Sequence, residues 1–190
     1  VGDSLTLREM LYGLLLTSGN DAAYAIAEHV AGNVPDFVKL MNNKAASLGL
    51  TNTEFSNPSG LSEPRPNFST AANLAKLMRY AMENPIFREI DTTKVFRTTS
   101  TLGIPFVFNN NHRLVQQVDY VIAGKTGFTQ ASGRTLISYA LKNKIPLIAV
   151  TLNDANDWKD QLNMFKFGYS IYGITVATPE IREENQLEGK

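Results

Sequence analysis

Two short polar clusters of this 190-residue chain carry side chains that suit acyl-transfer chemistry. Ser18-Gly19-Asn20 offers a hydroxyl and an amide, and Lys125-Thr126-Gly127 offers a cation and a hydroxyl at the end of an apolar run. Acyl transfer by a serine needs a nucleophile with a base, donors for the oxyanion, and groups that hold the substrate. The two clusters predict only the second half of such a site.

The nucleophile and its base are not found in their usual form. One large class of serine acyl-transfer enzymes carries both in a Ser-x-x-Lys motif. No serine or threonine of this chain has a lysine three positions later. We therefore expect a catalytic domain whose nucleophile segment lies outside these residues, and a chain that is inactive alone.

The two clusters differ in how much they indicate. A Lys-Thr-Gly triplet arises by chance in roughly one chain in twenty-five of this length, whereas Ser-x-Asn occurs in about half of them, so only the triplet carries weight alone. Ser18-Gly19-Asn20-Asp21 also has the form of a joint between two helices, with Asn20 or Asp21 capping the second helix.

Composition narrows the classes of function. The chain is 43% hydrophobic, which suits one domain with a sizeable core, and its 18 basic and 18 acidic residues balance. We therefore expect no nucleic-acid partner. The chain has no cysteine, and its two histidines, His29 and His112, are expected at the surface or in loops. This pattern predicts no metal site, and we expect no cofactor.

The sequence has neither an apolar run of membrane-spanning length nor the organisation of a signal peptide at residues 1–4. If the protein is exported, we expect its signal upstream of residue 1. A membrane anchor, if there is one, is likewise expected outside this segment.

The first half of the chain has the periodicity of helices. Thr6 to Glu9 forms a capping box, and apolar residues then recur at helical spacing up to the Ser18 joint. The same signals predict helices over about 21–30, 33–49, 70–81 and from Pro85, with a loop over 51–68. We expect residues 1–90 to form a helical subdomain.

Residues 91–175 are expected to form a sheet and a final helix. Alternation predicts a hairpin of strands over 94–99 and 104–108, then a meander of strands over 118–126, 134–142 and 146–152. An apolar stripe that suits a sheet face predicts the last helix, at Trp158, Leu162, Phe165, Tyr169 and Tyr172. Residues 176–190 resemble a polar tail or linker. The fold class is α+β.

Beyond the two clusters, several stretches resemble bacterial D-alanyl-D-alanine carboxypeptidases, the low-molecular-mass penicillin-binding proteins. They follow one another in that family's order at 14–23, 37–41, 46–55, 57–61 and 124–129, and the resemblance extends to about Tyr172. Residues 153–165 are most similar to its sporulation-associated branch. The resemblance implies the β-lactamase and penicillin-binding-protein fold, without its N-terminal strands and nucleophile helix, and an active site in the groove between helices and sheet.

The resemblance also implies roles for individual residues. Ser18 would relay a proton towards the leaving group, Asn20 would hydrogen-bond the substrate's peptide chain, and Lys125 would supply a positive field. Thr126 would hold the terminal carboxylate, next to Gly127, and the backbone N–H of Phe128 would be an oxyanion donor. The resemblance implies three partners for the chain: peptidoglycan stem peptides, β-lactam antibiotics and the absent N-terminal segment. It also implies an extracytoplasmic location.

The resemblance leaves open which residue anchors the carboxylate, because some relatives place an arginine in the loop before the triplet strand, where this chain has Asn109-Asn110-Asn111-His112-Arg113. A hairpin centred near Gln130 would place Arg134 opposite Thr126 on one sheet face. We therefore hypothesise that Arg134 and Thr126 together hold the carboxylate, the alternative being a solvated arginine at the root of the hairpin.

Two other functions remain open. Glu63-Pro64-Arg65-Pro66-Asn67 imitates the Glu-x-x-x-Asn segment of class A β-lactamases, although Pro66 and Gly19 depart from that pattern. A noncatalytic peptidoglycan-binding domain would also account for the missing nucleophile motif.

Overall fold

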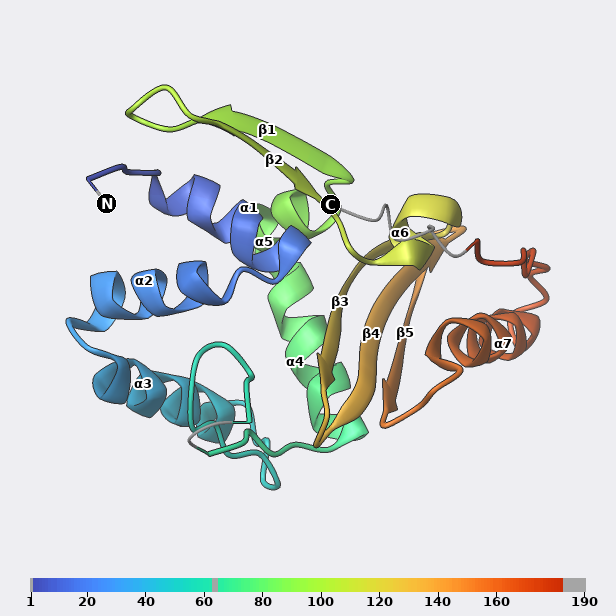
Figure 1. The fold of residues 1–190 in the computed structure, drawn as a ribbon. Coiled ribbons are helices and arrows are strands. Elements are labelled where there is room, and N and C mark those ends of the chain that lie inside the picture. The colour runs from blue at the N-terminus through green and yellow to red at the C-terminus, as the bar shows by residue number, and fades with distance from the viewer. Residues whose placement is uncertain (1, 63–64, 183–190) are drawn as a thin grey trace.

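The computed structural model of the chain describes residues 2–62 and 65–182. It has the predicted α+β architecture (Figure 1). In chain order the elements are α1 (Leu7–Thr17), α2 (Asn20–Ala31), α3 (Val34–Ser47), α4 (Ala71–Glu83), α5 (Pro85–Asp91), β1 (Val95–Thr99), β2 (Pro105–Asn109), α6 (Arg113–Gln117), β3 (Val121–Thr129), β4 (Gly133–Lys142), β5 (Ile145–Leu152) and α7 (Asp157–Ser170).

Local side-chain caps explain where the helices begin. The Thr6 hydroxyl accepts a hydrogen bond from the Glu9 backbone N–H at 3.3 Å, and the Glu9 carboxylate accepts one from the Thr6 N–H at 2.7 Å. Asn33 caps α3 and Thr70 caps α4 in the same way, through the N–H groups of residues 36 and 73. These starts confirm the sequence prediction, because each side chain satisfies a backbone donor that the helix leaves free.

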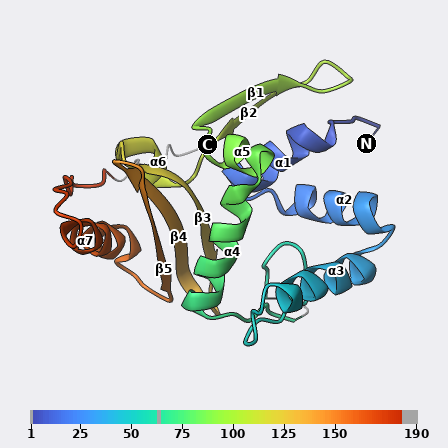
Figure 2. The ribbon, with the colours of Figure 1, turned by 180° about the vertical axis from the view of Figure 1, so that it is seen from behind.

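The main sheet is antiparallel, with strand order β3-β4-β5. In Figures 1 and 2, β3 is the strand nearest to α1, α2 and α3, while α7 lies on the far side of the sheet and α4 crosses the opposite face. One core lies between the sheet, α6 and α7 and includes Val121, Ala140 and Ala149 of the three strands together with Leu162, Phe165 and Tyr169 of α7. A second core packs Met78 and Met82 of α4 on the other face. Helix α4 therefore joins the helical part of the chain to strands β4 and β5.

The predicted hairpin exists, but β1 and β2 form a separate two-stranded sheet that packs on α1. The ring of Tyr12 from α1 stacks on Phe96 of β1 with their centroids 3.7 Å apart. This contact holds α1, and therefore the Ser18 joint at its end, against the hairpin of β1 and β2.

The hairpin of β3 and β4 differs from the prediction in its register. Thr126 pairs with Leu136, and Arg134 pairs with Phe128, so the expected pairing of Arg134 with Thr126 is wrong by two positions. The strands continue to Thr129, whose hydroxyl accepts a hydrogen bond from the Ser132 N–H at 3.0 Å, and Gly133 adopts a positive φ of 63°. The turn is therefore centred on residue 131 and not on Gln130.

Three further predictions need correction. Residues 113–117 form the short helix α6, and β3 begins at Val121, three residues later than expected. Tyr172 is 56% exposed and does not belong to the buried stripe of α7. Val176 is buried in the core beside α7, and Arg182 exchanges hydrogen bonds with Gln117, so residues 176–182 are attached to the fold at both ends, although residues 177–180 are exposed. The rest of the expected tail, 183–190, lies outside the described residues.

In residues 2–62 and 65–182 there is no helix long and apolar enough to cross a membrane.

Candidate active site

The two polar clusters meet in a groove of about 520 Å³ between the helices and the sheet. The joint between α1 and α2 forms one wall, residues 59–61 form a second, and β3, β4 and the start of α7 form the third. All the residues that the sequence proposed for the site line this groove, namely Ser18, Asn20, Lys125, Thr126, Gly127, Phe128 and Arg134.

Ser18 is held in an unusual backbone conformation at the end of α1. Its φ and ψ are 57° and 42°, the left-handed region that costs a residue with a Cβ about 1 kcal/mol. The conformation turns the chain sharply into α2 and leaves the Ser18 hydroxyl in the groove. There it accepts a hydrogen bond from the Lys125 Nζ atom, which also donates to the Thr126 carbonyl at 2.9 Å.

Lys125 has a weakened affinity for its proton. Burial lowers its pKa to about 8, and the carboxyl of Asp91 partly opposes this shift. A lysine with a pKa in this range can hold a positive charge at neutral pH and can also exchange a proton with a hydroxyl. The contact with Ser18 therefore forms a pair that can move a proton.

Two glycines permit the close approach of β3 to its neighbours. A Cβ at Gly124 would lie 2.2 Å from the Ile137 carbonyl oxygen and 2.6 Å from His112 Nε2. A Cβ at Gly127 would lie 2.5 Å from the Thr135 hydroxyl, which donates to the Gly127 carbonyl at 3.2 Å. The glycines that flank Lys125 and Thr126 thus allow β3 to approach β4 closely and leave the groove side of β3 accessible.

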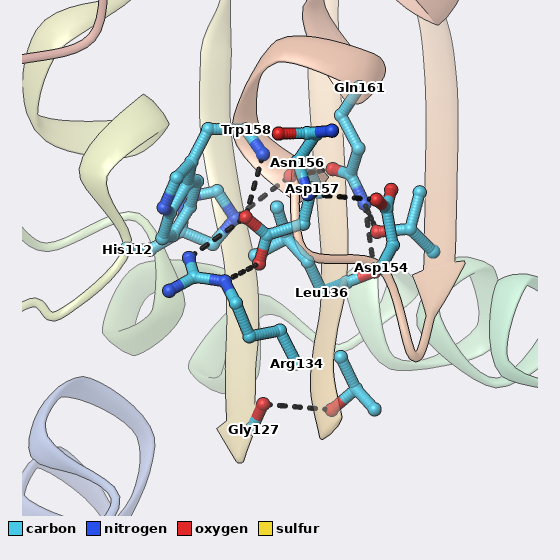
Figure 3. Close-up of polar contacts among 12 residues, drawn as sticks. His112, Gly127, Arg134, Leu136, Asp154, Asn156, Asp157, Trp158 and Gln161 are labelled. Carbon is cyan, nitrogen blue, oxygen red and sulfur yellow. Dashed lines mark hydrogen bonds and ion pairs between the residues drawn. The ribbon is translucent and has the colours of Figure 1, made fainter. Parts of the chain in front are cut away.

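Arg134 enters the groove already paired with a buried carboxylate (Figure 3). Its Nε donates to Asp157 Oδ2 at 3.1 Å and its Nη2 donates to Oδ1 at 2.8 Å, while the Asp157 side chain is only 3% exposed. The guanidinium also lies 5.5 Å from the centre of the Trp158 ring. Sequence reasoning missed Asp157; the available signal was an acidic residue at the first position of the helix that follows the last strand.

A second guanidinium reaches the same groove from α6. Arg113 is half-buried and lies 5.9 Å from the centre of the Trp158 ring, so the two arginines share one aromatic support. Among the described residues that line the groove, they and Lys125 are three cations, and Asp157 is the one anion. This excess of positive charge suits an anionic group on the ligand.

His112 lies in the loop before α6, as the sequence allowed, but it is not at the surface, because it is 1% exposed behind Gly124. Its Nδ1 accepts a hydrogen bond from the Val115 N–H at 3.3 Å, so Nε2 carries the proton and faces the Ile137 carbonyl at 3.2 Å and the Ser138 hydroxyl at 2.9 Å. Burial lowers its pKa to about 4. His29 is exposed, as expected.

Gln161 continues this polar network on the α7 side of the sheet (Figure 3). Its amide oxygen accepts from the Ser138 hydroxyl, and its Nε2 donates to the Leu136 carbonyl at 2.8 Å and the Thr151 hydroxyl at 3.2 Å. Neutral His112 and Gln161 therefore connect α6 and α7 to the middle strand directly behind the Lys125 position.

The wall formed by residues 51–62 and 65–68 is held by asparagines. The Asn57 amide donates to the carbonyls of Leu61 and Arg65, each at 2.9 Å, and Asn67 accepts from the N–H of Ser56 at 2.7 Å. Ser62 Oγ donates to Thr129 at 3.1 Å and joins this wall to the end of β3. Asn67 is thus used for loop structure, whereas Glu63 of the β-lactamase-like segment lies outside the described residues.

The chain is similar to known proteins over most of its length. A family model described as D-alanyl-D-alanine carboxypeptidase matches residues 1–156. The carboxypeptidase DacB2 of Mycobacterium tuberculosis is 35% identical over 177 residues, covering 90% of this chain and 60% of the relative, and DacF of Bacillus subtilis is 33% identical over 193 residues, covering 100% and 48%.

A solved structure of a mutant Streptomyces DD-transpeptidase superposes with a TM-score of 0.84 at 30% identity, covering 90% of this chain and 70% of the other. The chain thus spans between 48% and 60% of the length of the two curated relatives described above. By its family match, its relatives and its fold, the chain belongs to the D-alanyl-D-alanine carboxypeptidase family of low-molecular-mass penicillin-binding proteins.

Proposed function

We propose that this chain contributes the substrate-holding and proton-relay half of a serine D-alanyl-D-alanine carboxypeptidase that acts on peptidoglycan stem peptides. The observation that carries the proposal is the contact of Lys125 with Ser18 across 107 positions of sequence, in a groove that Asn20 and Thr126 also line. The nucleophile would come from a Ser-x-x-Lys segment outside these 190 residues.

The proposed reaction assigns each group a separate task. The external serine attacks the carbonyl between the two D-alanines, the C–N bond breaks, and Ser18 passes the serine's proton towards the departing amine. Lys125 stabilises the negative charge that develops, and the N–H of Phe128 is one donor to the oxyanion. Water then hydrolyses the acyl-enzyme ester and releases the shortened peptide.

Substrate binding would use the edge of β3 and its neighbours. Asn20 would hydrogen-bond the peptide backbone, Thr126 and Arg134 would hold the terminal carboxylate, and Gly127 would let the peptide approach the strand. The charge excess of the groove supports an anionic chain end. β-Lactam antibiotics, which also carry a carboxylate beside a reactive carbonyl, would occupy the same groove, and the setting would be extracytoplasmic.

Two alternatives give different results. A class A β-lactamase would hydrolyse its penicillin adduct within a second, whereas a carboxypeptidase adduct would last for minutes to hours. A noncatalytic binding domain would form no adduct even with the upstream segment present. The structural use of Asn67 favours the carboxypeptidase over the lactamase.

The test joins these residues to an upstream segment with Ser-x-x-Lys and measures D-alanine release from an N-acylated Lys-D-Ala-D-Ala peptide. We expect release that falls about 100-fold or more in Lys125→Ala, the range for removal of an electrostatic catalytic group. The matched control is Lys159→Ala, an exposed lysine on α7. Release that is equal in the two variants would contradict the role of Lys125, and no release from the joined protein would contradict the proposed function.

A further inference from the structure

Asp91, the last residue of α5, is a buried carboxyl group with no evident structural use. It is 1% exposed, and among the described residues neither of its carboxyl oxygens makes a hydrogen bond of normal geometry, although the Gly124 backbone N–H lies close enough to lower its pKa. Its place at the C-terminal end of a helix is also unfavourable for a negative charge. Buried polar groups are nearly always hydrogen-bonded, so this exception needs a specific explanation.

The backbone around Asp91 is fixed to the same loop that positions His112. The Asn110 side chain donates to the carbonyls of Asp91 at 3.4 Å and Thr93 at 3.1 Å, and its oxygen accepts from the His112 N–H at 2.9 Å. Asn110 is itself buried. The end of α5 is therefore clamped against the elements that lie directly behind Gly124 and Lys125.

Helix α5, which ends at Asp91, packs against β3, the strand that carries Lys125. Burial raises the pKa of Asp91 to about 7, and the Gly124 backbone N–H and the Lys125 cation act in the opposite direction. Reciprocally, Asp91 is the acidic group that opposes the burial shift of the Lys125 pKa. The two side chains thus influence each other's charge through a region of low polarity.

On its groove side, the hydrogen bonds that Lys125 makes within the described part of the chain go to neutral oxygens, those of Ser18 and Thr126. The other charged side chains on the elements that surround Asp91 and Lys125 either have partners of their own or leave the pKa of Asp91 unchanged. Arg8 and Glu89 form an exposed ion pair, Glu9 is bound by Thr6 and Thr98, and Arg134 is bound by Asp157. The remaining titratable groups on α1, α4, α6, β3 and β4 are Tyr12, Lys76, Arg79, Tyr80, Glu83, Arg113, Tyr139 and Lys142, and none of them shifts the pKa of Asp91.

We propose that Asp91 is a positioning residue for Lys125, a buried counter-charge behind β3 that keeps the lysine cationic while its groove side is free for Ser18 and substrate. The inference deepens the proposed function, on which its catalytic meaning rests. A counter-charge in the groove itself would compete with the substrate's carboxylate, whereas one behind the strand leaves the groove positive. The unpartnered carboxyl is explained because its role is a long-range interaction with Lys125.

The test is an NMR titration of the Lys125 side chain in the 190-residue chain, with its signal assigned by its loss in Lys125→Arg. In Asp91→Asn the midpoint of the Lys125 titration should fall by about 0.5 pH unit or more, because the burial effect then acts without an anion. The matched control is Asp119→Asn, an exposed aspartate two residues before β3. An unchanged Lys125 midpoint in folded Asp91→Asn would overturn the proposal.

A reciprocal titration covers the case in which Asp91→Asn does not fold. The Asp91 carboxyl carbon is followed in the unmodified chain and in Lys125→Met, where the Asp91 midpoint should rise by a similar amount because coupling is mutual. A stationary Asp91 midpoint would overturn the proposal independently. Neither titration needs turnover, so its outcome is distinct from the success or failure of the carboxypeptidase assay.

In the joined, active protein, the pH profile gives a further readout. Asp91→Asn should move the alkaline limb of kcat/KM to lower pH, because Lys125 then loses its proton earlier. Asp91→Glu should restore part of the shift. A lower rate with an unmoved alkaline limb would assign Asp91 a merely structural role.

Discussion

Arg134 is bound to Asp157, and this decides how it can serve a substrate. Two of the guanidinium nitrogens, Nε and Nη2, donate to the buried carboxylate, and the Nη1 group remains for a ligand. The register error of two positions did not change its face, because side chains alternate with a period of two along a strand. Arg134 therefore reaches the groove from a position diagonal to Thr126.

We predict that Arg134→Ala weakens turnover of a D-Ala-D-Ala peptide in the joined protein by about 1.5 to 3 kcal/mol in transition-state terms, the range for a charge-assisted hydrogen bond. A peptide whose terminal carboxylate is capped as an amide should lose almost nothing. The measurement is kcat/KM for both peptides. Equal losses on both would mean that Arg134 supports the hairpin and not the substrate.

At the scale of elements, the sequence predicted the parts whose signals are local. The capping box of Thr6 and Glu9 and the caps at Asn33 and Thr70 each depend on residues within one turn, so the starts of α1, α3 and α4 were predictable. Strand existence followed from alternation in the same way. What failed was the register of β3 and β4, because the turn depends on the Thr129 hydroxyl and on the positive φ of Gly133.

The residues of the candidate site also differ in whether a local sequence signal predicts them. The motif residues Ser18, Asn20 and Lys125 could be assigned because family motifs are contiguous in sequence. Asp157 and His112 could not, since their partners lie 23 to 26 positions away and only the folded sheet brings them together. A buried histidine also has no sequence signal that separates it from an exposed one.

His112 makes a prediction for the stability of the sheet and its helices. Its folded pKa of about 4 lies below the ordinary 6.5, so the neutral ring stabilises the fold fully above pH 6.5, and this contribution is lost as pH falls towards 4. We expect His112→Asn, which can still cap α6, to destabilise the chain at pH 7 by about 3 kcal/mol more than at pH 4.

Urea unfolding at a series of pH values measures this difference. Comparing the variant with the unmodified chain at each pH cancels the opposite trend of Asp91, whose raised pKa disfavours folding as pH rises from 3.8 to about 7. His29→Asn, at an exposed position, is the control and should show no such trend. A constant loss for His112→Asn across the range would show that the ring titrates normally.

At the scale of the whole molecule, the surface that most favours association is an apolar stripe on α7 beside the edge strand β5. Met164, Phe167 and Ile171 are 45%, 69% and 68% exposed at helical spacing, and β5 is hydrogen-bonded only to β4 among the described strands. An exposed apolar stripe next to a free strand edge favours association. Such a surface suits a further segment or a second copy of the chain.

We therefore predict that the chain alone does not sediment as a simple monomer. Phe167→Glu, which places a charge in the stripe, should shift sedimentation towards the monomer, whereas Leu40→Glu, at an isolated exposed position on α3, should not. Self-association through the apolar stripe is ruled out if the chain is monomeric at micromolar concentrations and unfolds in one cooperative transition.

If these residues form a serine acyl-transfer groove whose nucleophile lies outside them, they cannot be acylated by a penicillin on their own. Intact-mass analysis after incubation with benzylpenicillin measures this acylation. We expect no covalent adduct on the 190-residue chain, and one adduct per molecule when the chain is joined to an upstream segment with Ser-x-x-Lys. A stoichiometric penicillin adduct on the isolated chain would show instead that the nucleophile lies within these residues.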